Sequence, residues 1–138
     1  LPVKLKVHDS IFVPLAKWSM LLTGNYRCIR KDEMRSIKES VHSDPALSRS
    51  VYEWVSSVCR SIGASPDDLV PFEKYAAAAN GLTKPSSAAR ALLAGAKYIE
   101  RADCLVRTIA ALKGMQNDAV DESVIMVESW LERNRAKG

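Results

Sequence analysis

The side chains best suited to catalysis or binding lie on one stretch near the N-terminus. Lys17 stands between Ala16 and Trp18, and a lysine in apolar surroundings can have its proton affinity tuned for general-acid work. A lysine at a helix edge, with its stem on apolar residues and its ammonium group in water, has the same pattern. Asn25 follows about 80° away around an ideal helix, so it either faces the same cleft or belongs to the helix end.

The segment Lys84-Pro85-Ser86-Ser87 is a second candidate site. Its hydroxyl groups, together with the free amides at the start of a following helix, can hold a carboxylate or a phosphate. An ordinary capped turn contains the same residue types, so both interpretations stay open at this point.

Other chemistry is sparse in the sequence. The glycines lie at positions 24, 63, 81, 95, 114 and 138, too far apart for a Rossmann dinucleotide turn or a P-loop. His8 and His42 have no Cys, Asp or Glu at metal-ligand spacing, so we expect them at the surface of an arm and of a loop, with no metal site. Cys28, Cys59 and Cys104 are widely spaced, which favours small buried side chains in a reducing cytoplasm over disulfides.

Helices must position these residues, because apolar side chains recur at helical spacing after residue 10. An extended arm leads into a first helix from Ser10 to about Cys28, with Pro14 in its first turn. Asp32 is expected to cap a short second helix that ends near Ser40. Ser43-Asp44-Pro45 then opens a third helix, which Gly63 ends.

Four more helices follow from the same signals. Ser65-Pro66 predicts a fourth helix that ends at Asn80-Gly81, and a fifth spans 87–94 before Gly95. A sixth, over 98–113, is expected to turn inward the apolar residues Leu105, Ile109 and Leu112. A seventh begins near Asp118 and carries on one stripe the residues Val120, Val124, Val127 and Leu131. The prediction is an all-α fold, a single irregular bundle of about seven helices over residues 1–138.

Composition supports one globular domain. Apolar residues make up 47% of the 138 positions and charged residues 26%, the profile of a soluble protein. The net charge is +4, but acidic and basic residues alternate, which indicates solvated helix faces and argues against nucleic-acid binding. No apolar run approaches the roughly 20 residues of a membrane span, and the start at Leu1 is no signal peptide and indicates a fragment. We therefore expect a cytoplasmic protein that does not bind membranes.

The order of these features resembles the C-terminal helical domain of the ketopantoate reductase (2-dehydropantoate 2-reductase) family. The matching positions are Lys17, Asn25, Pro85-Ser86-Ser87, Gly95 and Glu100. The resemblance implies a fold like the C-terminal domain of 6-phosphogluconate dehydrogenase. It also implies a missing N-terminal Rossmann domain, a homodimer and a place in pantothenate biosynthesis.

In that family the lysine is the general acid that protonates the substrate ketone as hydride arrives from NADPH. The resemblance therefore implies that Lys17 is catalytic and that the substrate, a small 2-oxo acid, is bound by Asn25, Ser87 and Glu100. The chain has Leu21 where the family has an asparagine, and Glu100 comes one residue later than in the family. These differences leave two alternatives open, a relative that reduces another 2-oxo acid and one that has lost its activity. Isolated from a Rossmann domain, the chain is expected to bind no cofactor and to be inactive.

A function of a different class is also open. A helical module for protein interaction or dimerisation would associate through an apolar helix face. Its candidate anchors are Trp18, Trp54 and Trp130, because tryptophan is frequent at the energetic centre of interfaces. A small core also accounts for three tryptophans.

Overall fold

The computed structural model describes residues 15–138, which form helices, turns and one isolated antiparallel bridge between Ile29 and Met34. The all-α prediction is confirmed for this part of the chain. The extended arm, His8, Pro14 and the start of the first helix lie outside the described residues. No helix within 15–138 combines the length and the apolar character needed to cross a bilayer.

The first helix is continuous over residues 15–28 but changes its winding. It is α-helical at 15–20, π-helical in η1 (Leu21–Asn25) and 3₁₀-helical in η2 (Tyr26–Cys28). The elements that follow are α2 (Ile37–His42), α3 (Pro45–Ser61), η3 (Pro66–Asp68), α4 (Phe72–Ala79), α5 (Ser87–Leu93), α6 (Ala102–Leu112) and α7 (Asp118–Ala136).

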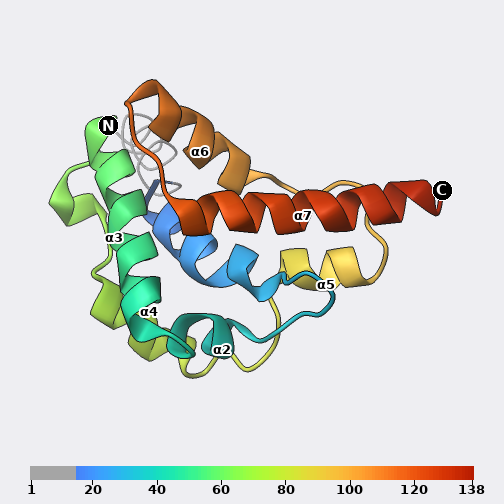
Figure 1. The fold of residues 1–138 in the computed structure, drawn as a ribbon. Helices are drawn as coiled ribbons and strands as arrows, with labels where there is room; N and C mark the ends of the chain where they lie inside the picture. The colour runs from blue at the N-terminus through green and yellow to red at the C-terminus, as the bar shows by residue number, and fades with distance from the viewer. Residues whose placement is uncertain (1–14) are drawn as a thin grey trace, which may run out of the picture.

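The long α7 crosses the molecule, as Figure 1 shows, with α6 on one side of it and the first helix and α5 on the other. The first helix contacts α2, α3, α5 and α6, and η2 also contacts α7. It is therefore the central element of the bundle. Side chains of the first helix, α3, α5, α6 and α7 form the main core, while a smaller cluster joins α2, α3 and α4.

Several helix ends follow the local signals in the sequence. Asp44 accepts a hydrogen bond from the Leu47 amide and caps α3, and Pro45 occupies the first turn. After α3, α5 and α6 the glycines at 63, 95 and 114 have φ values of 110°, 100° and 70°. Glycine adopts this left-handed conformation without the steric cost of a Cβ atom. The stripe of α7 is buried as predicted.

Three helix starts differ from the prediction, those of the second, fourth and sixth helices. The second helix begins after Ser36, whose hydroxyl accepts a hydrogen bond from the Glu39 amide, whereas Asp32 is exposed in the turn before Met34. The Ser65 cap opens only the 3₁₀ turn η3, and α4 begins after Pro71. Proline lacks an amide hydrogen and disfavours helical geometry in the residue before it, which separates the two elements.

The sixth helix starts at Ala102 and turns a different face inward. Leu105 and Leu112 are 49% and 81% exposed, and Ile109 is half-buried. The buried residues of α6 are Ala102, Asp103, Val106 and Ala110. The prediction of the inward face was wrong because small residues allow close helix packing and because Asp103, a charged residue, is buried against an arginine.

Candidate functional site

The π-helical turn lies between the predicted residues Lys17 and Asn25. The amide of Tyr26 donates to the Leu21 carbonyl, five residues back, and the Tyr75 hydroxyl donates to the Met20 carbonyl at 3.1 Å. A Cβ atom on Gly24 would lie 1.9 Å from the Tyr75 hydroxyl oxygen, so only glycine allows this approach. Turns of this kind are frequent at functional sites. The wider turn also changes the angle between Lys17 and Asn25 from that of an ideal helix.

Asn25 and Ser87 line one hollow of about 320 Å³. The hollow lies between the end of η1, the start of α2 and the segment 81–87. Ser86 joins its walls, because its hydroxyl donates to the Asn25 carbonyl at 2.8 Å and accepts the Ala89 amide at 3.2 Å as the N-cap of α5. The structure therefore brings together two of the four predicted site residues.

The charged residues that line this hollow are Lys84 and Arg90, and both are basic and exposed. Arg90 reaches the hydroxyl of Ser87 at 3.5 Å. An amide, a hydroxyl and two cations around a small space are suited to an anionic ligand with further polar groups. The apolar part of the lining comes from Ile37, Leu82 and Pro85.

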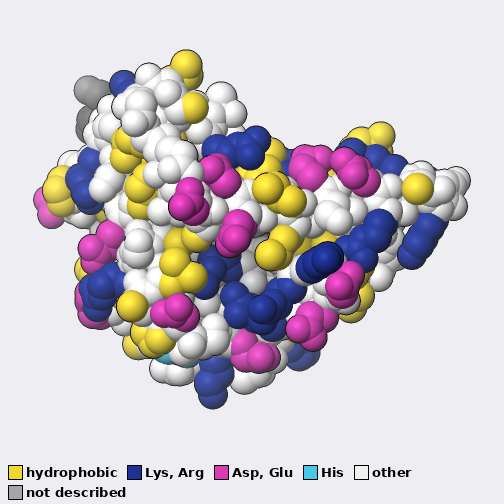
Figure 2. Space-filling model, viewed as in Figure 1, with side chains coloured by type: hydrophobic (Ala, Val, Ile, Leu, Met, Phe, Trp, Pro, Cys, Tyr) yellow, Lys and Arg dark blue, Asp and Glu magenta, His cyan; other side chains and the backbone are white. Residues whose placement is uncertain are grey.

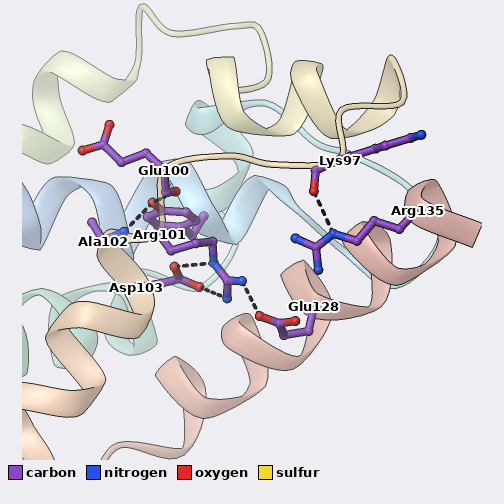
Figure 3. Close-up of polar contacts among 8 residues, drawn as sticks. Lys97, Glu100, Arg101, Ala102, Asp103, Glu128 and Arg135 are labelled. Atoms are coloured by element: carbon purple, nitrogen blue, oxygen red, sulfur yellow. Dashed lines mark hydrogen bonds and ion pairs between the residues drawn. The ribbon is translucent and has the colours of Figure 1, made fainter. Parts of the chain in front are cut away.

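Glu100 is tied to the first helix through its backbone. The Tyr26 hydroxyl donates to the Glu100 carbonyl at 2.6 Å and accepts the Ala102 amide at 2.9 Å. The carboxylate of Glu100 is on an exposed residue and points away from Arg101 in Figure 3. Glu100 is not among the lining residues of the hollow that Asn25 and Ser87 share.

Lys17 is exposed on the first helix, next to the half-buried Trp18 and two residues after the buried Leu15. It does not line the hollow either. Leu21, one turn after Lys17, is half-buried and packs against the main core. The described chain by itself thus leaves the ammonium group of Lys17 in contact with solvent.

Sequence reasoning missed an ionic cluster beside Glu100, drawn in Figure 3. The Arg101 guanidinium binds both oxygens of the fully buried Asp103 at 3.0 Å and also pairs with Glu128 of α7. Burial lowers the pKa of Arg101, but the hydrogen bonds to the two carboxylates outweigh burial and raise it. The sequence signal that could have indicated this cluster is Asp103, an acidic residue in the first turn of α6. The cluster attaches α6 to α7.

The remaining polar predictions have mixed outcomes. His42 ends α2 instead of lying in a loop, and its half-buried ring bonds the Ala76 carbonyl at 2.8 Å. Cys28 and Cys59 are buried and Cys104 is half-buried, all three as free thiols. Burial raises the pKa of Cys59 to about 11, so this thiol is held in its unreactive form.

The three tryptophans are partly buried and pack against the main core. Within residues 15–138, no three His, Cys, Asp or Glu side chains are grouped so that they could hold a metal ion.

Comparisons of the chain with models of protein families, with curated proteins and with solved structures each found no match.

Proposed function

We propose that this chain is the substrate-binding domain of an NADPH-dependent 2-oxo acid reductase of the ketopantoate reductase type. The observation that carries the proposal is the hollow in which Asn25 and Ser87 meet beside Lys84 and Arg90. A 2-oxo acid has a carboxylate for the cations and a ketone oxygen for hydrogen-bond donors. The fold that this proposal implies is the helical domain of the 6-phosphogluconate dehydrogenase type.

The open character of the site supports a domain that works with another. Lys17, Ser87 and Glu100 are all exposed, whereas a reacting ketone and its acid are normally shielded from water. Residues 15–138 contain no dinucleotide-binding turn, since their glycines are far apart and none joins a strand to a helix. Residues 15–138 therefore offer no Rossmann-type site for NADPH. In the proposal, a separate N-terminal Rossmann domain holds the cofactor and covers the exposed face.

Each residue then has a defined task. Arg90 and Lys84 attract the substrate carboxylate, and the Ser87 hydroxyl and the Asn25 amide orient it by hydrogen bonds. Lys17 lies two helical turns before Asn25 on the first helix and donates a proton to the ketone oxygen. Its positive charge also stabilises the negative charge that develops on that oxygen. Glu100, whose backbone carbonyl is held by Tyr26, is assigned a substrate-binding carboxylate from outside the hollow.

The first test is direct binding of ketopantoate and pyruvate to the chain, followed by NMR of its amides. We expect saturable shifts at Asn25, Ser87 and Arg90, and an affinity about tenfold lower in Arg90→Gln, as for loss of one charged hydrogen bond. Ser50→Ala is the matched control for Ser87→Ala, because Ser50 is exposed on α3 and far along the chain from the hollow. Only the Ser87 variant should weaken binding.

The second test uses the chain joined to its Rossmann domain and follows NADPH oxidation. Lys17→Ala should lower kcat about 100-fold or more, the usual contribution of a general acid. If the joined protein reduces no 2-oxo acid, or if Lys17→Ala leaves the rate unchanged, the assignment of this chain as a reductase domain is refuted.

One observation favours the alternative of a dimerisation module. Leu105 and Leu112 of α6 are exposed, and Leu112 lines an apolar hollow of about 670 Å³ with Trp54 and Met115. A second copy of the chain that covers this face would bury them. Sedimentation equilibrium should then show a dimer that Leu112→Arg dissociates and that Leu93→Arg, an exposed leucine of α5, leaves intact. A monomer at millimolar concentration would exclude this alternative.

A further inference from the structure

A second hollow, of about 250 Å³, lies away from the predicted substrate site. Its walls come from the end of the first helix, the segment that leads to α2, the start of α3 and one side of α7. We call it the Arg27 pocket. Its charged lining residues are Arg27, Arg30, Arg35, Asp44 and Glu122. Three guanidinium groups therefore face two carboxylates.

Arg27 is the unusual residue of this pocket, because this arginine is only 8% exposed. Its Nη1 donates to the Thr23 carbonyl at 3.2 Å and to the Ser48 hydroxyl at 2.9 Å. Among residues 15–138 no acceptor takes a hydrogen bond from its Nε or Nη2, and no carboxylate pairs with it. A buried guanidinium is normally paired. Arg27 lines the pocket, and its Nε and Nη2 are the donors without an acceptor among the described residues.

The other two arginines add to the positive charge. Arg35 donates from Nε to the Arg27 carbonyl at 3.0 Å and from Nη1 to the Ser43 hydroxyl at 3.2 Å, and Arg30 is exposed. The ion pairs found in the described part of the chain involve neither of them. Figure 2 shows basic side chains below α7, over the segment between the first helix and α2, with acidic side chains beside them.

The pKa shifts of Arg27 and Arg35 agree with a positive charge in the pocket that is only partly balanced. Burial and then the charge of Arg35 lower the pKa of Arg27, while Asp44 partly offsets them. Burial and then the charge of Arg30 lower the pKa of Arg35. Asp44 is itself engaged, because it accepts the Leu47 amide as the cap of α3. A bound anion would balance the charge that Asp44 and Glu122 leave over.

We propose that the Arg27 pocket binds the phosphate group of a small soluble phosphoester. Guanidinium groups present forked N–H donors that match phosphate oxygens, and a dianion suits several cations better than a single carboxylate does. The pocket volume equals about eight water molecules at their volume in the liquid. This space accommodates a phosphate and a small organic group.

The test measures binding of glycerol 3-phosphate and of inorganic phosphate to the chain by calorimetry and amide NMR, with acetate as the carboxylate probe. Arg30→Ala and Lys31→Ala are matched variants, because each removes one exposed charge from the same turn but only Arg30 lines the pocket. We expect Arg30→Ala to weaken glycerol 3-phosphate binding at least threefold and Lys31→Ala to leave it unchanged. Arg27→Met should weaken it tenfold or more, with thermal unfolding as the check on folding.

Several outcomes would overturn the proposal. They are no saturable phosphate binding, equal effects of Arg30→Ala and Lys31→Ala, and binding to phosphatidic acid vesicles without binding of glycerol 3-phosphate. If Arg27→Met does not fold, the comparison of Arg30 with Lys31 still decides. Failure of this proposal leaves the substrate site untouched, because the 2-oxo acid titration reports on different residues.

Discussion

Removal of the Tyr26 hydroxyl tests how the first helix is joined to the start of α6. Tyr26 is buried, and its hydroxyl bonds both the Glu100 carbonyl and the Ala102 amide. Ala102 is the first residue of α6, and Arg101 before it provides no side-chain cap. The Tyr26 hydroxyl, 76 positions away in the chain, therefore takes the place of a local cap.

Replacement of Tyr26 by phenylalanine removes this hydroxyl and leaves the ring in place. A buried amide without an acceptor costs about 1–3 kcal/mol, and the second bond adds about 1 kcal/mol. We expect Tyr26→Phe to lower the free energy of unfolding by about 2–4 kcal/mol. With a urea dependence of about 2 kcal/mol per molar, the midpoint of unfolding should fall by about 1–2 M.

The assay is equilibrium unfolding in urea, followed by far-UV circular dichroism. Tyr98→Phe is the matched control, because Tyr98 is 80% exposed and no hydrogen bond of its hydroxyl is found within 15–138. This control should stay within about 0.5 kcal/mol of the wild type. If Tyr26→Phe also stays within that range, the hydroxyl does not cap α6 and the explanation of how Glu100 is positioned fails.

Three further predictions concern the same framework. Gly24→Ala should destabilise the chain by about 2 kcal/mol or more, because its Cβ would meet the Tyr75 hydroxyl at 1.9 Å, whereas at Gly81 the nearest atom is 3.7 Å away and Gly81→Ala should be neutral or stabilising. Asp103→Asn should cost about 1–3 kcal/mol, because it removes the buried charge partner of the half-buried Arg101, which keeps Glu128 as its second partner. Burial raises the pKa of Tyr26 from 10.0 to about 12. Between pH 10 and 12 the unfolded chain thus loses a proton that the folded chain keeps, and stability should fall by up to about 1.4 kcal/mol per pH unit for this group.

Urea unfolding measures all three effects, the last one as a series of pH values. Equal stability of Gly24→Ala and Gly81→Ala would contradict the close approach at the π turn. A loss below about 1 kcal/mol in Asp103→Asn would show that Asp103 is not a buried ion-pair partner. A pH dependence above 10 that is unchanged in Tyr26→Phe would mean that this tyrosine does not carry it.

The helix starts that depend only on neighbouring residues were predicted correctly. The starts of α3 at Asp44-Pro45 and of α5 at Ser87 were predicted correctly, because a cap involves residues within three or four positions of each other. Asp32 has the residue type of a cap, but its turn pairs Ile29 with Met34, so the helix begins at Ser36 instead. The fourth helix was predicted too early because a second proline, Pro71, outweighed the first cap.

The inward face of α6 shows where periodicity fails. Leu105 and Leu112 follow helical spacing, and so does the stripe of Val106 and Ala110. A count of apolar residues prefers the larger side chains, but the chain buries the smaller ones together with Asp103. This choice depends on Arg101 and on Glu128 of α7, which approach Asp103 only after the bundle has formed.

The sequence alone thus determined the helical class and most helix ends, because caps, prolines and apolar spacing act over short distances. Tertiary structure alone decided that Asn25 and Ser87 share a hollow, that Tyr26 caps α6, and that Arg27 is buried without a carboxylate partner among the described residues. These features join residues far apart in the chain. Their energies come from burial and hydrogen bonding, which exist only once the helices have packed.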